Sequence, residues 1–362
     1  MILYSFRKLV KQKVLNYFFL VKVVFITSFE KSKSKCIYID IREIELNRYL
    51  LNFIKFFTIK GYSVYIPNDS SLIGKLFINK GELKYASLIL KEKIKIGKPK
   101  KGTNVLWIKK EQLSNDFFNS DYYGNELFYH VPMSKYPLMY NPENINVVPN
   151  LTTIRKKSGF MAGNFDKDRY EDISKKKYFD IPNRREVIEY IYTQDYYKKL
   201  RNHKELIDFI EKDEDNFVFL IDRQDDFSLS LSELLKILEK FSFYIALPGV
   251  VMPQSHNLIE AIGSGCIPII HETYAKLFIP SLVNQETAII YKNINELNNI
   301  IAECFLMSEE EILVLRKNVI NYYNLYLSPL SVVEKILNSS FEKIFIQAEH
   351  VSLSLLENKN NL

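Results

Sequence analysis

Residues 243–271 read FYIALPGVVMPQSHNLIEAIGSGCIPIIH, and this stretch decides the fold. An apolar strand is predicted over Phe243–Leu247 and is followed by a loop that begins with Pro248-Gly249. A helix is predicted over Asn257–Gly263, with Ser255 as its N-cap, and a second apolar strand follows it. Strand, helix and strand within so short a span predict a βαβ unit and therefore a parallel sheet.

Polar side chains gather at the start of that helix. The helix begins with Ser255, His256 and Asn257. Glu260 lies four residues after His256, so the two side chains share one face of the helix. The positive helix end favours an anion such as a diphosphate, the imidazole can donate to a phosphate, and the carboxylate can accept bonds from two ribose hydroxyls. The alternative is a plain crossover, in which Ser255 only caps the helix, His256 lies on the surface and Glu260 belongs to a salt bridge.

The same alternation of strands and helices continues on both sides of this stretch. Towards the N-terminus, strands are predicted over Cys36–Ile41, Ser63–Ile66 and Val105–Ile108, with a helix over Arg48–Lys60 that Gly61 closes. Around the central stretch, strands are predicted over Ser158–Ala162, Asn216–Ile221 and Ala288–Ile290, with helices over Arg184–Tyr192, over Ser230–Lys240 and from Ile294. The pattern predicts an α/β protein made of two doubly wound, Rossmann-like domains that face a cleft.

The domain boundary is predicted in a stretch without periodicity. Residues 130–158 are rich in Pro, Asn, Tyr and Ser, and we place the boundary near Asn141 to Lys157. The prediction is therefore an N-terminal domain over residues 1–150, a C-terminal domain over 151–345 and a tail over 346–362, of which residues 351–362 are polar and expected to be frayed.

The central stretch resembles the C-terminal signature of exostosin-like and related bacterial GT-B glycosyltransferases. The residues that carry this resemblance are Pro248, Gly249, Pro253, Ser255, His256, Asn257, Glu260, Ala261, Gly265, Ile267, Pro268 and Ile269. The resemblance continues upstream, to the family's opening strand and the arginine-bearing helix after it. The residues that carry this part are Gly163-Asn164-Phe165, Tyr170 and Asn183-Arg184. The resemblance covers about residues 155–300, and the N-terminal half matches only loosely.

The resemblance implies transfer of a sugar from a nucleotide-sugar donor, which serves as co-substrate without any further cofactor. The donor is expected mainly on the C-terminal domain, and a glycan, lipid-linked or protein acceptor on the N-terminal one, in the assembly of a surface polysaccharide or glycoconjugate. Such enzymes need no bound metal and offset the diphosphate charge with Arg or Lys and a helix end. The alternative is a non-catalytic subunit of the same fold that binds sugar nucleotides or glycans.

Three charged residues outside the central stretch are candidates for the same site. Arg184, at a helix start, is predicted to clamp the β-phosphate as the leaving group departs. Arg223, after a strand, is a candidate for contact with the base or the phosphates, and Asp40, at the end of the first strand, for the general base. The alternatives are a solvated helix start, a loop arginine and a turn residue.

Two further features concern the chemistry of the site. His130, which precedes the aperiodic stretch, is a candidate for contact with donor or acceptor, with a structural role as the alternative. Asp225-Asp226, which follows a strand, is interpreted as a turn and not as a metal-binding motif. The three cysteines, Cys36, Cys266 and Cys304, form no Cys-x-x-Cys pair, so they predict neither a zinc site nor a disulfide framework and indicate a reducing, cytoplasmic compartment.

Charge is distributed unevenly along the 362 residues. The first 110 residues carry a net charge of +16 and the rest carry −10, which gives the overall +6. This asymmetry predicts that the front half meets an anionic partner, with a solvated lysine surface as the alternative. Nucleic acid is not expected, because no recognised binding motif accompanies the charge.

The first residues predict a basic, amphipathic helix. Leu3, Phe6, Val10, Val14 and Tyr17 recur at helical spacing, and nearby lysines and an arginine lie mostly off that stripe. Such a helix can lie peripherally on the inner, anionic face of a membrane, or it can pack its stripe on the protein's own core. The apolar stretch that follows it is too short and too charged to span a bilayer, and no cleavage site of small residues marks a secretory signal.

Overall fold

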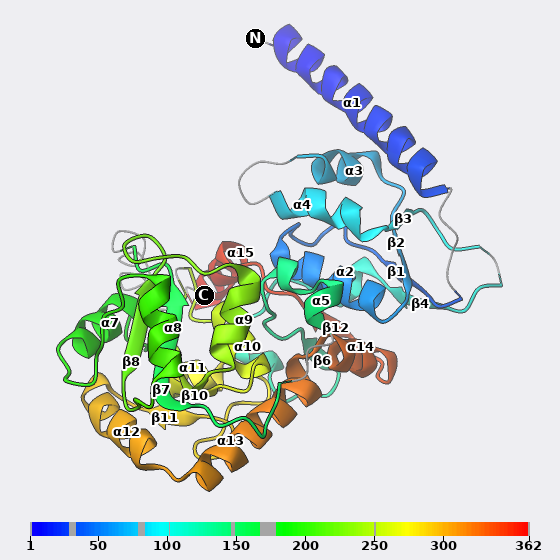
Figure 1. Ribbon diagram of the computed structural model, residues 1–362. Coiled ribbons are helices and arrows are strands. Elements are labelled where there is room, and N and C mark those ends of the chain that lie inside the picture. Colours follow the sequence, from blue (N-terminus) through cyan, green and yellow to red (C-terminus); the bar gives the residue numbers. More distant parts are fainter. Residues whose placement is uncertain are drawn as a thin grey trace. The chain divides into compact units, whose positions relative to one another are not determined.

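The computed structural model describes residues 2–28, 34–78, 84–100, 102–145, 149–166, 179–249 and 251–360 of the chain. The chain forms two compact α/β units (Figure 1). Unit 1 comprises Met1–Val131 together with Pro329–Leu362, and unit 2 comprises Pro132–Ser328. Each unit is built on a parallel sheet whose strand order reverses, so the predicted α/β fold with two doubly wound sheets is confirmed.

Unit 1 contains two parallel sheets among its described residues, in the orders β3-β2-β1-β4 and β5-β12-β6. The strands are β1 (Cys36–Ile39), β2 (Ser63–Ile66), β3 (Lys95–Ile96), β4 (Val105–Ile108), β5 (Leu113–Ser114), β6 (Phe128–His130) and β12 (Lys343–Phe345). The described α-helices are α1 (Ile2–Ser28), α2 (Arg48–Ile59), α3 (Ser70–Leu76), α4 (Lys84–Ile89), α14 (Pro329–Leu337) and α15 (His350–Asn360).

Helix α2 shows why the N-terminal pattern folds as predicted. The Asn47 side chain accepts the N–H groups of Tyr49 and Leu50 and so caps the first turn. Phe53 and Phe57, one turn apart, are fully buried and pack edge to face. Gly61 follows the helix with a φ of +88°, a conformation that favours glycine.

Unit 2 contains a parallel sheet whose described strands follow the order β11-β10-β9-β7-β8. The strands are β7 (Lys156–Gly163), β8 (Val218–Asp222), β9 (Phe241–Ile245), β10 (Ile267–His271) and β11 (Ile289–Tyr291). The described α-helices are α5 (Pro142–Ile145), α7 (Arg184–Tyr192), α8 (His203–Glu211), α9 (Leu231–Leu238), α10 (His256–Gly263), α11 (Glu272–Lys276), α12 (Ile294–Leu306) and α13 (Glu309–Tyr322). Every strand and helix predicted for this half is present, with ends shifted by at most a few residues.

The division between the units differs from the predicted boundary near residue 150. Unit 2 already begins at Pro132, and the N–H of Tyr136 donates to Glu260 within that unit. The segment after Pro132 packs in unit 2 as irregular chain, which is why its sequence shows no helical or strand periodicity. A stretch without periodicity therefore does not by itself mark a linker between domains.

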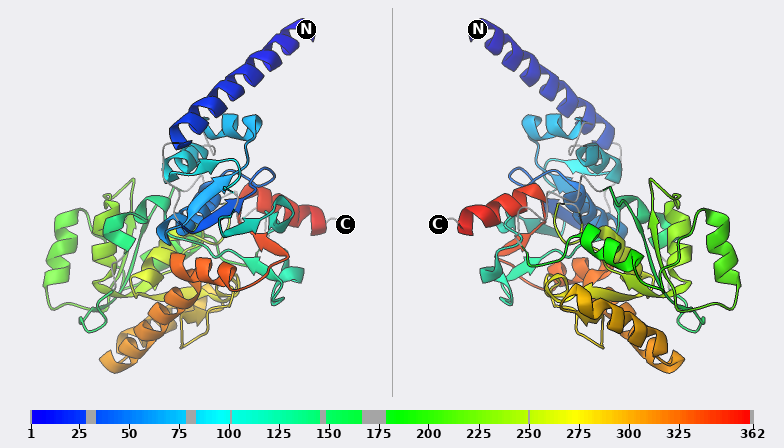
Figure 2. Two further views of the ribbon diagram at one scale, coloured as in Figure 1. Left: turned by 90° about the vertical axis from the view of Figure 1, so that its right-hand side faces the viewer. Right: turned by 90° about the vertical axis from the view of Figure 1, so that its left-hand side faces the viewer.

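The C-terminal segment also differs from the prediction, which assigned it to the second domain and a frayed tail. Strand β12 lies between β5 and β6, and α14 packs against α2, so the segment completes unit 1 (Figure 2). In α15 the Ser352 hydroxyl is buried and donates to the carbonyl of Asn115. Ser352 thus satisfies a buried backbone carbonyl.

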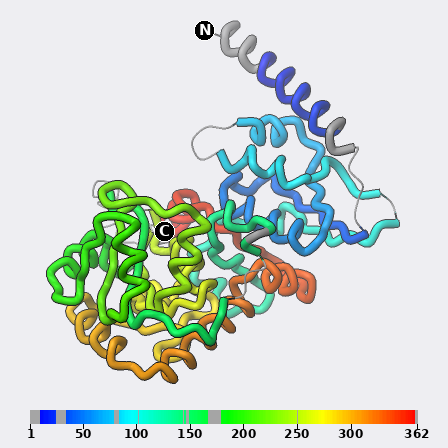
Figure 3. Tube along the Cα trace, in the orientation of Figure 1, coloured from blue at the N-terminus to red at the C-terminus, as the bar shows by residue number. Residues whose placement is uncertain are grey.

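The predicted N-terminal helix is present and is longer than expected, because α1 continues to Ser28. It extends past the rest of unit 1 (Figure 3). Val10, Val14 and Tyr17 of the predicted stripe are exposed, so these three do not pack on the protein's core. Leu3 and Phe6 lie outside the residues whose side chains are described. Within the described ranges, none of the helices combines the length and the apolar character that crossing a bilayer requires.

Candidate functional site

The strand order of unit 2 reverses between β7 and β9. Strand β8 lies beyond β7 on one side, and β10 and β11 lie beyond β9 on the other. At such a switch point the connections leave in opposite directions, and ligands of open α/β sheets bind in the crevice at the carboxyl ends of the strands. The loops that start there are Gly163-Asn164 after β7 and Pro248-Gly249 after β9. The structure therefore brings two separate predicted segments to the same edge.

Arg184 joins these two loops. Its Nε donates to the carbonyl of Pro248 at 2.8 Å, and its Nη1 donates to the carbonyl of Asn164 at 2.8 Å. The side chain is 3% exposed and starts α7, where Asn183 and Glu186 form a reciprocal capping box. The guanidinium therefore holds the loops across the switch point, and its predicted contact with a phosphate stays a prediction.

Two glycines of the site lie where an added side chain would be crowded. A Cβ at Gly163 would lie 3.2 Å from the Asn257 amide nitrogen and 3.4 Å from Arg184 Nη1. A Cβ at Gly249 would lie 2.5 Å from the carbonyl oxygen of Met252. These glycines allow the backbone and the polar groups of the crevice to approach closely.

Helix α10 begins at this edge, as predicted. Ser255 is its N-cap residue, but the serine side chain makes no capping bond, and the Ser255 N–H donates to the hydroxyl of Tyr274 at 2.8 Å. The Asn257 side chain donates to the carbonyl of Ala162 at 3.0 Å and ties the helix start to the end of β7. The first turn is thus placed by its neighbours and is not capped by its own serine.

Glu260 lies in α10, one turn after His256, and is 1% exposed. Its Oε1 is 2.9 Å from Nδ1 of His256 and accepts the N–H of Tyr136 at 3.0 Å. Its Oε2 is buried and has no hydrogen-bond partner among the described residues. A buried carboxylate oxygen left without a donor is costly, and an incoming hydroxyl would satisfy it.

Tyr136 was not predicted as part of the site. It lies 124 residues before Glu260, and its ring is 5.5 Å from the His256 ring between centroids. The contact uses the backbone N–H, which every residue except proline carries, so no signal in the sequence identifies it.

Arg223 lies where the prediction placed it, directly after β8. Its N–H donates to the carbonyl of Gly163 at 2.8 Å, and its side chain is exposed. The neighbouring Asp225-Asp226 forms a turn, as interpreted, and Asp226 accepts the N–H of Asp222 at 2.9 Å. Arg223 therefore follows β8 at this edge of the sheet, and its contact with the base or the phosphates stays a prediction.

Asp40 directly follows β1, where the order of the unit 1 sheet reverses between β1 and β4. Its carboxylate is nearly buried and forms two side-chain bonds with Arg42, from Nε at 2.8 Å and from Nη2 at 2.5 Å. These hydrogen bonds to Asp40 raise the pKa of Arg42. The predicted general base is thus held in an ion pair, and a base role requires Arg42 to release it.

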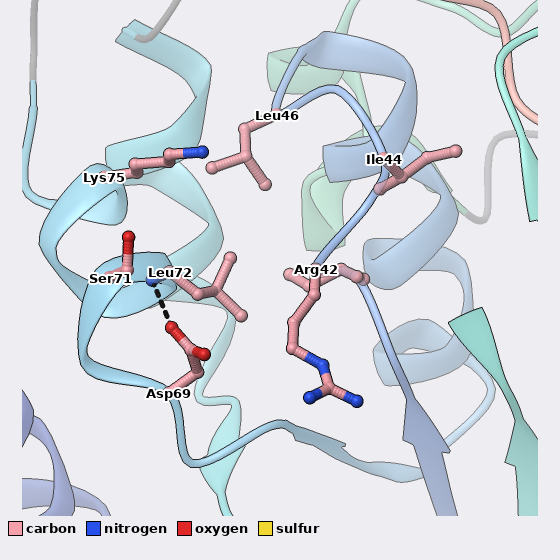
Figure 4. A pocket seen from close by; sticks show the side chains of 8 residues that line it. Arg42, Ile44, Leu46, Asp69, Ser71, Leu72 and Lys75 are labelled. Carbon is pink, nitrogen blue, oxygen red and sulfur yellow. Dashed lines mark hydrogen bonds between the residues drawn. The ribbon is translucent and has the colours of Figure 1, made fainter.

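A pocket of about 150 Å³ lies beside this pair, between the chain that leaves β1 and helix α3 (Figure 4). Apolar side chains line part of it, and polar ones line the rest. The lining residues are Ile41, Arg42, Ile44, Leu46, Asp69, Ser71, Leu72 and Lys75. Asp69 accepts the N–H of Leu72 at 2.8 Å, and the guanidinium of Arg42 and the ammonium of Lys75 belong to the side chains that line the pocket (Figure 4).

His130 lies within unit 1 and packs among aromatic rings. The ring stacks on Phe345 at 4.5 Å between centroids and meets Tyr123 and Phe117 edge to face at 4.8 and 5.4 Å. Burial lowers the pKa of His130 to about 4. This environment is that of a packed, neutral histidine, which agrees with the structural alternative.

Tyr170 and the question of a metal site remain among the features raised by the sequence. Tyr170, part of the resemblance, lies outside the described residues. Over the described part of the chain, His, Cys, Asp and Glu side chains do not gather in groups of three or more that could hold a metal ion.

Solved structures similar to this chain include several glycosyltransferases. WaaG, described as a glycosyltransferase involved in lipopolysaccharide biosynthesis, is 11% identical, with a TM-score of 0.35 over 83% of this chain and 99% of WaaG. Anabaena HepE, solved with UDP, is 12% identical, with a TM-score of 0.35 over 84% of this chain and 98% of HepE.

A TarM variant from S. aureus, solved with fondaparinux, α-GlcNAc-glycerol and UDP, is 17% identical, with a TM-score of 0.32. That match covers 54% of this chain and 38% of the TarM chain, and a second TarM structure matches over 79% of this chain and 57% of TarM, so this chain spans less than two thirds of TarM's length. No protein-family model and no curated protein matches the chain, so the resemblance to exostosin-like enzymes stays a prediction. The function proposed below therefore depends on the site itself.

Proposed function

We propose that the protein transfers a sugar from a nucleotide-sugar donor. The observation that carries this proposal is the convergence of the Gly163-Asn164 loop, Arg184, the Pro248-Gly249 loop and the start of α10 at the β7/β9 switch point. Open α/β sheets bind nucleotides at this position, where backbone N–H groups and a positive helix end face the phosphates.

Each polar group of the site has a proposed role toward the donor. The diphosphate binds at the start of α10, beside the buried guanidinium of Arg184. A ribose hydroxyl donates to Oε2 of Glu260, the oxygen that has no partner among the described residues. If His256 donates its Nδ1 proton to Glu260, then Nε2 can donate to a phosphate only in the imidazolium form, whose charge Glu260 offsets.

The acceptor is proposed to bind unit 1 at the edge that carries Asp40 and the neighbouring pocket. We propose a glycan, lipid-linked or protein acceptor, and a role in surface polysaccharide or glycoconjugate assembly in the cytoplasmic compartment. The mixed lining of the pocket, with cationic groups beside apolar ones, suits an acceptor that has both a polar and an apolar part. Asp40 is the proposed base once Arg42 turns away from it.

One observation favours the alternative of a non-catalytic, sugar-nucleotide-binding protein. The candidate base Asp40 is held by both side-chain bonds to Arg42. A protein that only binds the donor needs the switch-point site and no free base.

The test is incubation with a panel of radiolabelled nucleotide sugars, scored for binding, hydrolysis and transfer. Arg184→Gln should weaken donor binding at least tenfold, because it removes a charge and the link between two loops. Arg185→Gln is the matched control, because Arg185 lies on the same helix, is exposed and pairs with Glu189. Binding without turnover would favour the alternative, and a folded protein that binds none of the nucleotides would contradict both functions.

A further inference from the structure

One face of helix α1 packs against the rest of unit 1. A Cβ at Gly74 of α3 would lie 2.1 Å from Oδ1 of Asn16, so α1 approaches the α3 backbone directly. Phe19 stacks on Phe77 at 4.2 Å between ring centroids, and Val23 is buried. These contacts fix how the helix is rotated about its own axis relative to α3.

The opposite face of α1 is apolar and exposed. Val10, Val14, Tyr17 and Val21 are 43%, 64%, 64% and 53% exposed, and their spacing places them within an arc of about 60°. Phe18, beside them, is 60% exposed. Since the rotation of α1 is fixed by its packed face, this stripe cannot turn inward against unit 1.

Cations flank the stripe, and the helix itself carries no acidic residue. Residues 2–28 contain five Lys or Arg and no Asp or Glu. By helical spacing, Lys13 lies on one side of the stripe and Lys11 and Lys22 lie on the other, and all three are exposed. Strand β3 also packs against α1, and it is followed by the exposed Lys98.

We propose that this face of α1 docks in the plane of an anionic lipid bilayer. The apolar stripe enters the boundary between headgroups and acyl chains, and the flanking lysines meet anionic headgroups. A second copy of the chain fits less well as the occupant, because two such helices bring only like charges together. The inference goes beyond the proposed function and holds whether or not the protein transfers a sugar.

Sedimentation with vesicles tests the proposal directly. The full chain should bind vesicles that contain phosphatidylglycerol and should not bind pure phosphatidylcholine. Binding should weaken as salt shortens the Debye length from about 10 Å at 0.1 M to about 3 Å at 1 M. Replacing Lys11, Lys13 and Lys22 by Gln should lower the partition coefficient by about fivefold for each lysine, or about 100-fold together.

Lys204→Gln, Lys236→Gln and Lys317→Gln in one chain make the matched control. These lysines are exposed in unit 2, and the change in net charge is the same. Val14→Asp, at an exposed position, should abolish binding without changing the thermal midpoint. Failure of the folded protein to bind anionic vesicles at low salt overturns the proposal. A dimer in size-exclusion chromatography that Val14→Asp dissociates would identify a second copy as the occupant and would also overturn it.

Discussion

At the scale of single residues, Glu260 makes the most specific demand on a ligand. One of its carboxylate oxygens is committed to Tyr136 and His256, and the other is buried without a partner among the described residues. Glu260→Ala should therefore lower the affinity for a nucleoside diphosphate by about 1–3 kcal/mol, as measured by calorimetry. The wild type should discriminate against the 2′,3′-dideoxy analogue by a similar amount, and the Ala variant should bind both nucleotides equally.

The Glu260→Gln variant distinguishes two causes of lost affinity, the loss of a ribose contact and a disturbance of helix α10. An amide oxygen can still accept the N–H of Tyr136, so this variant should keep the thermal midpoint closer to the wild type than the Ala variant does. If both variants keep full affinity and full preference for the ribose hydroxyls while folded, the assignment of Glu260 to the ribose is wrong.

At the scale of elements, the small sheet β5-β12-β6 places a histidine where it cannot easily be charged. The folded-state pKa of His130 is lowered from 6.5 to about 4 by burial, so the unfolded chain takes up the proton first as the pH falls. The contribution of neutral His130 to the free energy of unfolding is fully present above pH 6.5. It is lost as the pH falls from 6.5 towards 4, by up to about 3 kcal/mol. Urea unfolding at pH 7 and pH 5 measures this loss.

His130→Phe should remove that pH dependence. The side chain already packs among the rings of Phe117, Tyr123 and Phe345, and its Nε2 has no partner among the described residues. His203→Gln is the control, since His203 is exposed and should leave the pH dependence intact. An unchanged loss of stability in the Phe variant would mean that other groups cause it.

Elements with strong local patterns were predictable, and those built by distant partners were not. The position of α10 follows from a short stretch, because helical spacing and flanking apolar strands are local signals, whereas its first turn is held by Tyr274 and the end of β7. Strand β12 has three residues and pairs with strands more than two hundred residues earlier, so no local pattern marks it. The ion pair that holds Asp40 and the backbone contact of Tyr136 likewise depend on tertiary packing.

At the scale of the whole molecule, we expect positively charged groups of the protein, and not a metal ion, to offset the negative charge of the donor's diphosphate. Arg184 and the start of α10 lie at the switch point, where a guanidinium and a positive helix end can offset the charge of a diphosphate. Transfer or hydrolysis should therefore persist in EDTA at the rate seen without it, in an assay with the nucleotide sugar that the panel identifies. Loss of activity on chelation with recovery on adding Mn²⁺ would show that a metal takes part.

The return of the chain to unit 1 has a consequence for how the protein is made. The ribosome releases residues from the N-terminus onward, and β12 is the central strand of the small sheet, between β5 and β6. Unit 2 is complete once Ser328 has emerged, whereas unit 1 waits for Phe345, although most of unit 1 is synthesised first. During translation, β5 and β6 therefore lack the strand that pairs with both of them, and the first unit to be started is the last that can finish folding.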